Sequence, residues 1–458
     1  MVVESLLEIA DKAIKTAVGK GVSQAQATAF LIDVELTRFA NSQIHQNVGI
    51  KDGGMLVKVI LDDKRIGILR ANTLDETEIG NAVKQAVEIA KVSQPNKDFK
   101  SLPEPEPWKA VKGAFDHETA SCTPEHRAQK VKEAIETAHS ESPKVRAVAG
   151  YISTNNISFA VANSLGVSAS AQLTTANMKT TVISRENGSE GFGAAQKYSR
   201  RVSDINPTDM AREAAEKSVK SLNPARIPLN EYGVVLSPLA VGTIFRFLAY
   251  IGFSARSFQD GRSFIKYHLN KRVFDEKLNL KDDARDSRTF YAMPVDGEGV
   301  PKRSLHLIEN GVVSEESVCY DSFTAGRENK KSTGHSLPPL SVRYFGGTLP
   351  FNMIVEPGDS SLEEMIEETR EGIFVTFLHY INPVEPTKAV LTGLTRDGTF
   401  LIQDGEITKP VVNMRFTDSM LSALNEIQLI GRNSEIVGQT TVSPMKLRKL
   451  RFVGHSAY

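Results

Sequence analysis

The clearest structural signal in this sequence is residues Thr392–Ser419, TGLTRDGTFLIQDGEITKPVVNMRFTDS. Asp397-Gly398 and Asp404-Gly405 are Asp-Gly pairs, which supply the positive φ angles that tight hairpin turns need. Between them, Thr399–Gln403 carries β-branched, aromatic and aliphatic residues, which favour an extended chain. The pattern predicts two or three short strands joined by turns, within a β-rich C-terminal region.

The bulk composition narrows the class of protein. A chain of 458 residues is too long for one simple core, so two or three domains are expected. Lys plus Arg and Asp plus Glu both number 55, and this balance argues against a dedicated nucleic-acid binder. The longest apolar stretch, Leu239–Phe253, is interrupted by Arg246 and is shorter than the roughly 18 residues of a membrane span.

Cysteine usage and the N-terminal sequence favour a cytoplasmic protein. The two cysteines, Cys122 and Cys319, allow no disulfide framework and fit a reducing compartment. The N-terminus lacks a basic segment followed by an apolar core, so we expect no signal peptide. Apolar residues at helical spacing predict instead an amphipathic helix over residues 5–17.

Two proline-containing stretches divide the chain into predicted domains. Ser93–Trp108 is rich in proline and charge, and Asn223–Pro228 contains two prolines, which block helix continuation. We therefore expect domains at residues 1–105, 106–226 and 227–458. The predicted fold class is α/β (α+β), with helix-covered, mostly antiparallel sheets in the N-terminal half and a β-rich C-terminal domain.

Local signals predict several element boundaries. Thr123-Pro124 and Asn206-Pro207 each place a capping side chain before a proline at the first helical position, which predicts a helix start. The segment Thr417–Ile430 is predicted to be the last helix. Glu190–Ala194 contains two glycines but lacks the rest of a phosphate-binding G-x-G-x-x-G loop, so it is predicted to be a glycine-rich hairpin.

Several C-terminal segments resemble one known family in their order and spacing. The stretch Thr392–Ser419 resembles the C-terminal region of the TldD/PmbA (TldE) proteins, once called modulators of DNA gyrase. Further similar segments are Asp296–Pro301, Leu307–Gly311, Ser332–Gly334 and Asn352–Ile366. The resemblance covers the predicted C-terminal domain strongly and the preceding domains diffusely. It implies zinc-dependent peptidase chemistry, because the active member of the family carries a His-Glu-x-x-x-His (HExxxH) motif.

This chain departs from the family at the zinc motif. No two of its nine histidines lie four or five residues apart, so the motif is absent. In the active subunit, the motif follows a strand that resembles Tyr232–Pro238 here, which places its three key positions at Arg246, Phe247 and Ile251. None of these side chains is a zinc ligand or a glutamate base. The sequence predicts no metal ligand and no catalytic residue in this chain.

The resemblance therefore points to the PmbA/TldE-type subunit, which in the family pairs with a zinc-bearing subunit. It implies a heterodimer with a TldD-like partner that holds the zinc, or a homodimer when that partner is absent. The implied substrates are small or unfolded peptides, admitted to an enclosed cavity between the subunits. Neither nucleic acid nor a membrane is an expected partner.

Two groups of polar residues in the last domain are candidate peptide contacts. One follows the strand-like run Ile373–Tyr380 and combines an imidazole, a phenol and an amide. The other contains two arginines, whose rigid forks of donors suit a peptide carboxylate or backbone, and an aspartate. Local hydrogen bonds and turn-stabilising salt bridges are the alternative interpretation of both groups. The candidate substrate-binding residues are His379, Tyr380, Asn382, Arg396, Asp397 and Arg415.

Two other functions are compatible with the sequence. The first is a metallopeptidase that acts alone, with a non-standard metal site assembled from dispersed residues. The second is a non-enzymatic protein that modulates a partner such as DNA gyrase. The residues considered for the dispersed metal site are His335, His379, His455 and Cys319.

Overall fold

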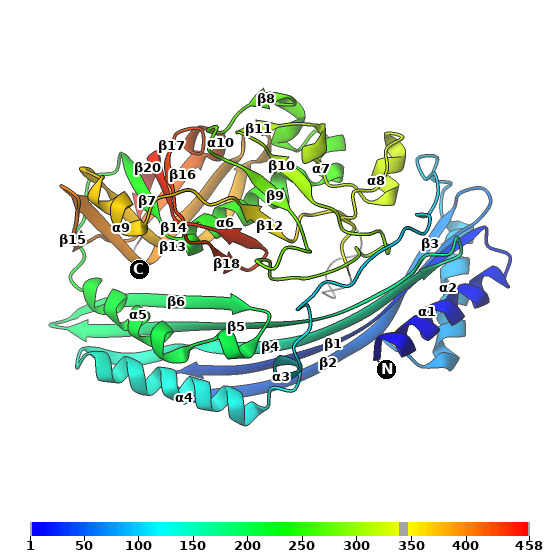
Figure 1. Cartoon of the computed structure of the whole chain (residues 1–458), viewed down its shortest axis with the longest axis horizontal. Helices are drawn as coiled ribbons and strands as arrows, with labels where there is room; N and C mark the ends of the chain where they lie inside the picture. The colour runs from blue at the N-terminus through cyan, green and yellow to red at the C-terminus, as the bar shows by residue number, and fades with distance from the viewer. Residues whose placement is uncertain (1, 339–346, 457–458) are drawn as a thin grey trace.

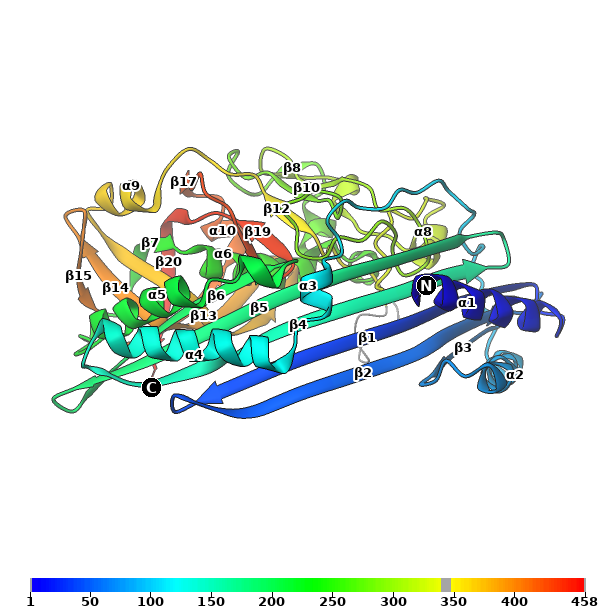
Figure 2. The same ribbon diagram turned by 60° about the horizontal axis from the view of Figure 1, so that its bottom comes forward.

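The computed structural model describes residues 2–338 and 347–456 of the chain, which form two layers (Figure 1). The N-terminal half builds one long, curved sheet, and the β-rich C-terminal part lies on its concave side. The helices of the N-terminal half cover the opposite face of the sheet, α1 and α2 near one end and α4 and α5 near the other (Figure 2).

Every neighbouring pair in the N-terminal sheet is antiparallel, and the strand order is β3-β2-β1-β4-β5-β6. The strands are β1 (Gln24–Ala40), β2 (Gln43–Ile60), β3 (Ile66–Ala71), β4 (Val145–Asn163), β5 (Ser168–Glu186) and β6 (Ser189–Ser199). The helical segments around them are α1 (Val2–Val18), α2 (Glu76–Val92), α3 (His117–Ala120), α4 (Pro124–Glu141), the 3-10 turn η1 (Val202–Asp204) and α5 (Pro207–Lys220).

Side-chain alternation along β1 explains how one sheet serves two layers. Ala27 and Ala29 pack against α1 and α2, whereas Phe30 and Ile32 point to the other face and pack against C-terminal residues such as Met293. Successive residues of a strand point to opposite faces, so both faces of this strand are buried in different cores.

The sheet crosses the boundary predicted at residue 105. Strand β1, from the predicted first domain, pairs with β4, from the predicted second domain, and Phe30 lies opposite Phe159. The predicted residues 1–105 and 106–226 therefore share one sheet. The two predicted helix starts are confirmed, because Thr123 and Asn206 each accept backbone N–H bonds at the beginning of α4 and α5.

Strands in the C-terminal part close on themselves. Strands β13, β7, β20, β16 and β14 pair in that order, and β14 pairs again with β13. The ring strands and their neighbours are β7 (Glu231–Leu236), β13 (Glu371–Glu385), β14 (Val390–Gln403), β15 (Glu406–Pro410), β16 (Met414–Ser419), β17 (Ile427–Ile430) and β20 (Met445–His455). The ring encloses part of the largest apolar cluster among the described residues.

Smaller strands and short helices complete the C-terminal part. A second sheet has the order β10-β9-β12-β19-β18, and β8 pairs with β11. The remaining strands are β8 (Lys271–Arg272), β9 (Leu280–Asp282), β10 (Leu305–Ile308), β11 (Val312–Val313), β12 (Met353–Val355), β18 (Glu435–Val437) and β19 (Thr440–Val442). The helical segments are α6 (Pro238–Leu248), the π-helical η2 (Ala249–Phe253), α7 (Ala255–Gln259), η3 (Phe264–Tyr267), η4 (Glu315–Ser317), α8 (Ser322–Arg327), α9 (Leu362–Glu367), η5 (Pro386–Lys388) and α10 (Met420–Ala423).

The predicted fold class is confirmed, with antiparallel sheets under helices and a β-rich C-terminal part. Of the two predicted Asp-Gly turns, Asp404-Gly405 joins β14 to β15 as expected. The Asp397-Gly398 turn is wrong, because β14 continues through it as a bulge with φ of 55° and 128°. Thr376 of β13 places its hydroxyl 3.0 Å from the Asp397 carbonyl oxygen, which holds the bulge against the neighbouring strand.

The predicted last helix over Thr417–Ile430 is also wrong. The segment contains the end of β16, the short helix α10 and the strand β17. Strand β16 pairs with β14 on one side and β20 on the other, so its backbone groups are already bonded in the sheet. Among the described residues, no helix is both long and apolar enough to cross a lipid bilayer.

Candidate functional site

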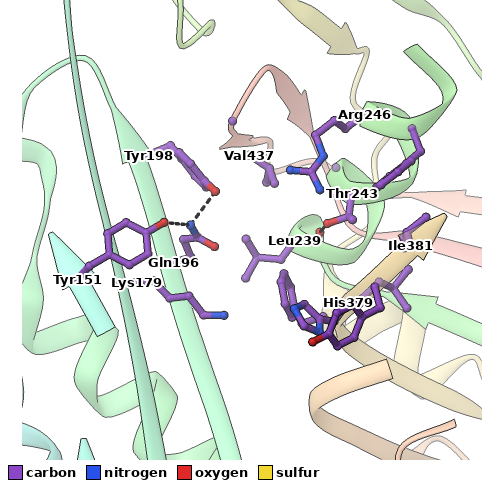
Figure 3. Close-up of a pocket in the computed structure, with 16 residues that line it drawn as sticks. Tyr151, Lys179, Gln196, Tyr198, Leu239, Thr243, Arg246, His379, Ile381 and Val437 are labelled. Carbon is purple, nitrogen blue, oxygen red and sulfur yellow. Dashed lines mark hydrogen bonds between the residues drawn. The ribbon is translucent and has the colours of Figure 1, made fainter. Parts of the chain in front are cut away.

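A cavity of about 430 Å³ lies between the N-terminal sheet and the C-terminal part of the chain (Figure 3). One wall comes from β4, β5 and β6, and the other from α6, β13 and the turn between β18 and β19. The volume falls in the range of roughly 300–1,000 Å³ that is usual for ligand pockets. The arrangement makes this cavity the candidate functional site.

Three side chains on the sheet wall form one row across neighbouring strands. Tyr151 of β4 lies opposite Lys179 of β5, which in turn lies opposite Gln196 of β6. Residues opposite each other in adjacent strands point to the same face, so the pairing register brings them together. Tyr198 is two residues beyond Gln196 and shares its face of β6.

The two tyrosines on this wall are held in place by one amide. Gln196 Nε2 donates hydrogen bonds to Tyr151 Oη at 3.1 Å and to Tyr198 Oη at 2.6 Å (Figure 3). Burial raises the pKa of both phenols, so both stay neutral in the physiological range. Each hydroxyl accepts from the amide and keeps its own O–H, which is able to donate into the cavity.

The cavity carries positive charge from both walls. Lys179 extends from β5, and Arg246 extends from α6 toward the same space (Figure 3). Lys179 Nζ lies 4.6 Å from the centre of the Phe377 ring and 3.7 Å from Asp397 Oδ2. Arg246 lies over the Phe247 ring at 5.4 Å. Among the described residues, no aspartate or glutamate lines the cavity.

An irregular strand segment supplies the aromatic rim of the cavity. The register of β13 shifts between His379 and Asn382, and Tyr380 takes a left-handed backbone conformation with φ of 49°. The His379 and Tyr380 rings lie 4.1 Å apart between centroids, and the Tyr380 side chain remains largely exposed. Burial, the Arg396 guanidinium and the Lys179 ammonium lower the pKa of His379, which favours the neutral imidazole.

The structure separates the predicted substrate-binding residues into three groups. His379 and Tyr380 line the cavity. Arg396 and Asp397 lie behind this lining, with Arg396 Nη1 3.3 Å from His379 Nδ1 and Asp397 almost fully buried. Asn382 and Arg415 are exposed outside the cavity lining. Asn382 donates to the Tyr380 carbonyl at 3.1 Å, and Arg415 donates to the Thr392 hydroxyl at 3.4 Å.

The positions that stand in place of the zinc motif belong to α6 and η2. Arg246 and Phe247 line the cavity, whereas Ile251 is buried in the C-terminal core. A guanidinium offers only donors, and phenyl and aliphatic groups offer no lone pair, so these residues do not fit a zinc ion. The chemistry of the cavity is therefore that of hydrogen-bond donors and cations.

The residues considered for a dispersed metal site lie in different surroundings. Both ring nitrogens of His335 are bonded, one to Asp282 Oδ2 at 3.0 Å and the other to Thr333. His455 contacts the Ile227 carbonyl oxygen at 2.9 Å, and Cys319 is fully buried. Within residues 2–338 and 347–456, no group of three or more His, Cys, Asp or Glu side chains is placed to hold a metal ion.

Sequence reasoning missed the whole sheet wall of the cavity, namely Tyr151, Lys179, Gln196 and Tyr198. The spacing of Gln196 and Tyr198 is a local signal, since residues two apart on a strand share a face. The pairing of Tyr151 with Lys179 and Gln196 depends on the strand register, which no local pattern specifies.

Comparison with known proteins connects the whole chain to one family. Models of the PmbA/TldA metallopeptidase match in three parts: domain 1 at residues 34–90, the central domain at 119–222 and the C-terminal domain at 229–454. A metalloprotease PmbA homolog of Haemophilus influenzae is 25% identical over 98% of both chains. A metalloprotease of Methanocaldococcus jannaschii is 25% identical over 58% of both chains, and a zinc metalloprotease TldD homolog of Saccharolobus solfataricus is 26% identical over 60% of this chain and 64% of its own.

Solved structures share the fold at low sequence identity. TldE from Thermococcus kodakarensis superposes with a TM-score of 0.89 at 19% identity, covering 97% of this chain and 100% of its own. A Thermotoga maritima protein described as a candidate modulator of a DNA gyrase gives a TM-score of 0.87 at 21% identity, covering 97% and 99%. These likenesses concern the fold, and the three domain matches concern the family. The chain belongs to the PmbA/TldD metallopeptidase family.

Proposed function

We propose that this chain is the PmbA/TldE-type subunit of a TldD/TldE-like metallopeptidase, in which a TldD-like partner holds the zinc. One observation carries the proposal. Helix α6 presents Arg246 and Phe247 to the cavity at the positions that the family resemblance assigns to the zinc motif. The chain keeps the fold of the family and replaces the metal-binding groups by groups that do not bind metal.

On this proposal the chain contributes peptide-binding surface rather than catalytic groups. The cavity offers donors from both walls and an aromatic rim at His379 and Tyr380, which suit the polar backbone and termini of a small or unfolded peptide. The proposed complex is a heterodimer with the TldD-like subunit, and a homodimer of this chain is the alternative assembly when that subunit is absent. A cytoplasmic location is part of the proposal, and both cysteines are buried and unpaired within the described residues.

The decisive experiment is a peptidase assay on an unstructured peptide, with zinc quantified in the same samples. It compares this chain alone, a TldD-like partner alone, and the two co-expressed. We expect stoichiometric zinc and chelator-sensitive cleavage in the co-expressed sample, with neither in this chain alone. The physical reason is that zinc needs three or four converging N, O or S ligands, and the described residues supply no such group.

The same comparison separates the alternative functions. Stoichiometric zinc and chelator-sensitive cleavage by this chain alone would establish a stand-alone metallopeptidase and refute the subunit proposal. Binding of the partner without any gain in cleavage would favour a non-enzymatic modulator.

A further inference from the structure

We propose that the cavity is a carboxylate-binding subsite that holds the C-terminal carboxylate of a peptide between Arg246 and Lys179. The inference rests on the proposed function for its choice of a peptide as the ligand. Its chemical part, an anion held between two cations from opposite walls, rests on the cavity alone (Figure 3).

Positive charge around the cavity exceeds the negative charge that nearby carboxylates supply. Within the described residues, Arg246 forms no ion pair with a carboxylate, and its guanidinium lies over the Phe247 ring. Lys179 has one carboxylate nearby, Asp397, at 3.7 Å. Asp397 also lies 3.5 Å from Arg396 Nε, so one buried carboxylate is shared by two cations. An anionic ligand would supply the missing counter-charge.

The hydroxyl groups of the sheet wall add neutral donors to the two cations. Gln196 donates to both Tyr151 and Tyr198, which leaves the O–H of each phenol for another acceptor. A carboxylate has about four lone-pair sites on two oxygens and accepts several donors at once. Arg246 suits such a group especially well, because its guanidinium presents parallel N–H donors.

The remaining lining fits the end of a peptide better than a bare ion. Leu239, Ile381 and Val437 give the cavity an apolar portion beside its charged groups. The volume of about 430 Å³ exceeds what a small inorganic anion fills. A terminal residue would place its carboxylate among the donors and its side chain against this apolar portion.

The test measures binding of two peptides that differ in one group. One short unstructured peptide carries a free C-terminal carboxylate and the other a C-terminal carboxamide, each with a fluorophore at the N-terminus. Anisotropy is measured with the full chain and with the co-expressed complex. We expect the carboxylate peptide to bind at least tenfold more tightly. Arg246→Gln and Lys179→Gln should each remove about tenfold of the carboxylate peptide's affinity and weaken carboxamide binding by a clearly smaller factor.

Variants with smaller changes separate charge from folding. Tyr198→Phe removes one donor and should weaken carboxylate binding by a few fold, and Arg246→Lys should retain part of the affinity. Arg272→Gln, on exposed β8 outside the cavity lining, is the matched control and should bind like the wild type. Thermal unfolding of every variant verifies that the fold is intact.

The outcomes distinguish this inference from the proposed function. Equal affinity for both peptides, unchanged by Arg246→Gln, would overturn the carboxylate subsite even if the complex cleaves peptides. Displacement of the carboxylate peptide by inorganic phosphate at concentrations where acetate has no effect would assign the cavity to an inorganic oxyanion instead. Preferential carboxylate binding without zinc-dependent cleavage in the co-expressed sample would support the subsite and overturn the proposed function.

Discussion

At the residue scale, the buried imidazole of His335 is fixed by charged neighbours from separate segments. Its Nε2 lies 3.0 Å from Asp282 Oδ2, and the Lys302 ammonium lies 3.4 Å from the same oxygen. Burial alone would raise the pKa of Asp282, but Lys302 and His335 hold it at about 2. Burial and Lys302 lower the pKa of His335, while Asp282 partly opposes them. A neutral histidine and an ionised aspartate therefore accompany the folded state.

This histidine predicts a loss of stability on mild acidification. Its folded pKa lies below the unfolded value of about 6.5, so the unfolded state binds more protons below that pH. The stability that the neutral His335 imidazole contributes is fully present above pH 6.5. It is lost as the pH falls from the unfolded pKa towards the lower folded pKa. We expect urea unfolding midpoints to fall more between pH 7.5 and 5.5 for the wild type than for His335→Gln.

Other groups titrate in both proteins, so the difference between the two pH profiles isolates His335. Each unit of pKa shift corresponds to about 1.4 kcal/mol. The exposed His45 on β2 supplies the control, and His45→Gln should keep the wild-type profile. Identical profiles for the wild type and His335→Gln would contradict the assignment of a destabilising protonation at this site.

At the scale of elements, α5 approaches β6 through a glycine. A Cβ atom at Gly193 would lie 2.2 Å from the Ala214 carbonyl oxygen and 2.4 Å from the Ser218 nitrogen, both on α5. The segment Glu190–Ala194, predicted to be a glycine-rich hairpin, lies wholly in β6, one strand of the antiparallel β5–β6 hairpin. Its glycines allow a helix to pack closely on the sheet. The same strand carries Gln196 into the cavity, so helix packing and the cavity wall are connected.

Gly193→Ala is expected to separate α5 from β6 and to destabilise the chain by about 1–3 kcal/mol, the usual cost of overpacking. Urea unfolding measures the loss of stability. Binding of the carboxylate peptide should also weaken, because β6 carries Gln196 into the cavity. Gly80 on α2 is the contrasting control, since nothing lies within 4 Å of a Cβ added there. Gly80→Ala should stabilise the helix by up to about 1 kcal/mol. Equal effects of the two substitutions would refute the packing argument.

At the scale of the whole molecule, an ion pair with a buried carboxylate and a partly exposed ammonium joins the N-terminal sheet to the C-terminal part. Lys58 of β2 lies 3.1 Å from Glu298 Oε1, and Glu298 Oε2 accepts the Ser322 backbone N–H at 2.8 Å. Burial and the Glu298 carboxylate raise the pKa of nearby Asp296, which accepts backbone N–H bonds around the same turn. The junction therefore concentrates carboxyl groups, and Lys58 supplies the nearest cation.

Lys58→Met should weaken this junction strongly, because it leaves the Glu298 carboxylate buried without its counter-charge. Removing one partner of a fully buried pair costs about 3–5 kcal/mol, and the partial exposure of Lys58 places the expected loss below that range. Urea unfolding measures this change in stability. The double variant Lys58→Met, Glu298→Gln should recover part of the loss. Lys51→Met, at an exposed position of the same strand, should change stability by less than about 0.5 kcal/mol. If Lys58→Met were as stable as the Lys51→Met control, the ion pair between Lys58 and Glu298 would not hold the two layers together.

The sequence by itself determined features that depend on a few neighbouring residues. Thr123-Pro124 and Asn206-Pro207 begin helices, and Asp404-Gly405 makes a turn, because capping and positive φ are local requirements. The family resemblance and the absence of its zinc motif are also properties of the sequence. His379 and Tyr380, which line the cavity, are likewise recognisable from the sequence as polar residues at the end of a predicted strand.

Only the tertiary structure decided what distant segments do to one another. Asp397-Gly398 became a bulge rather than a turn because Thr376 and the rest of β13 pair with β14 on either side of it. The row of Tyr151, Lys179 and Gln196 exists because β4, β5 and β6 pair in one register. Arg246 faces this row from a separate layer. The physical reason is that strand register and layer packing are set by contacts between residues far apart in the sequence, which no local pattern specifies.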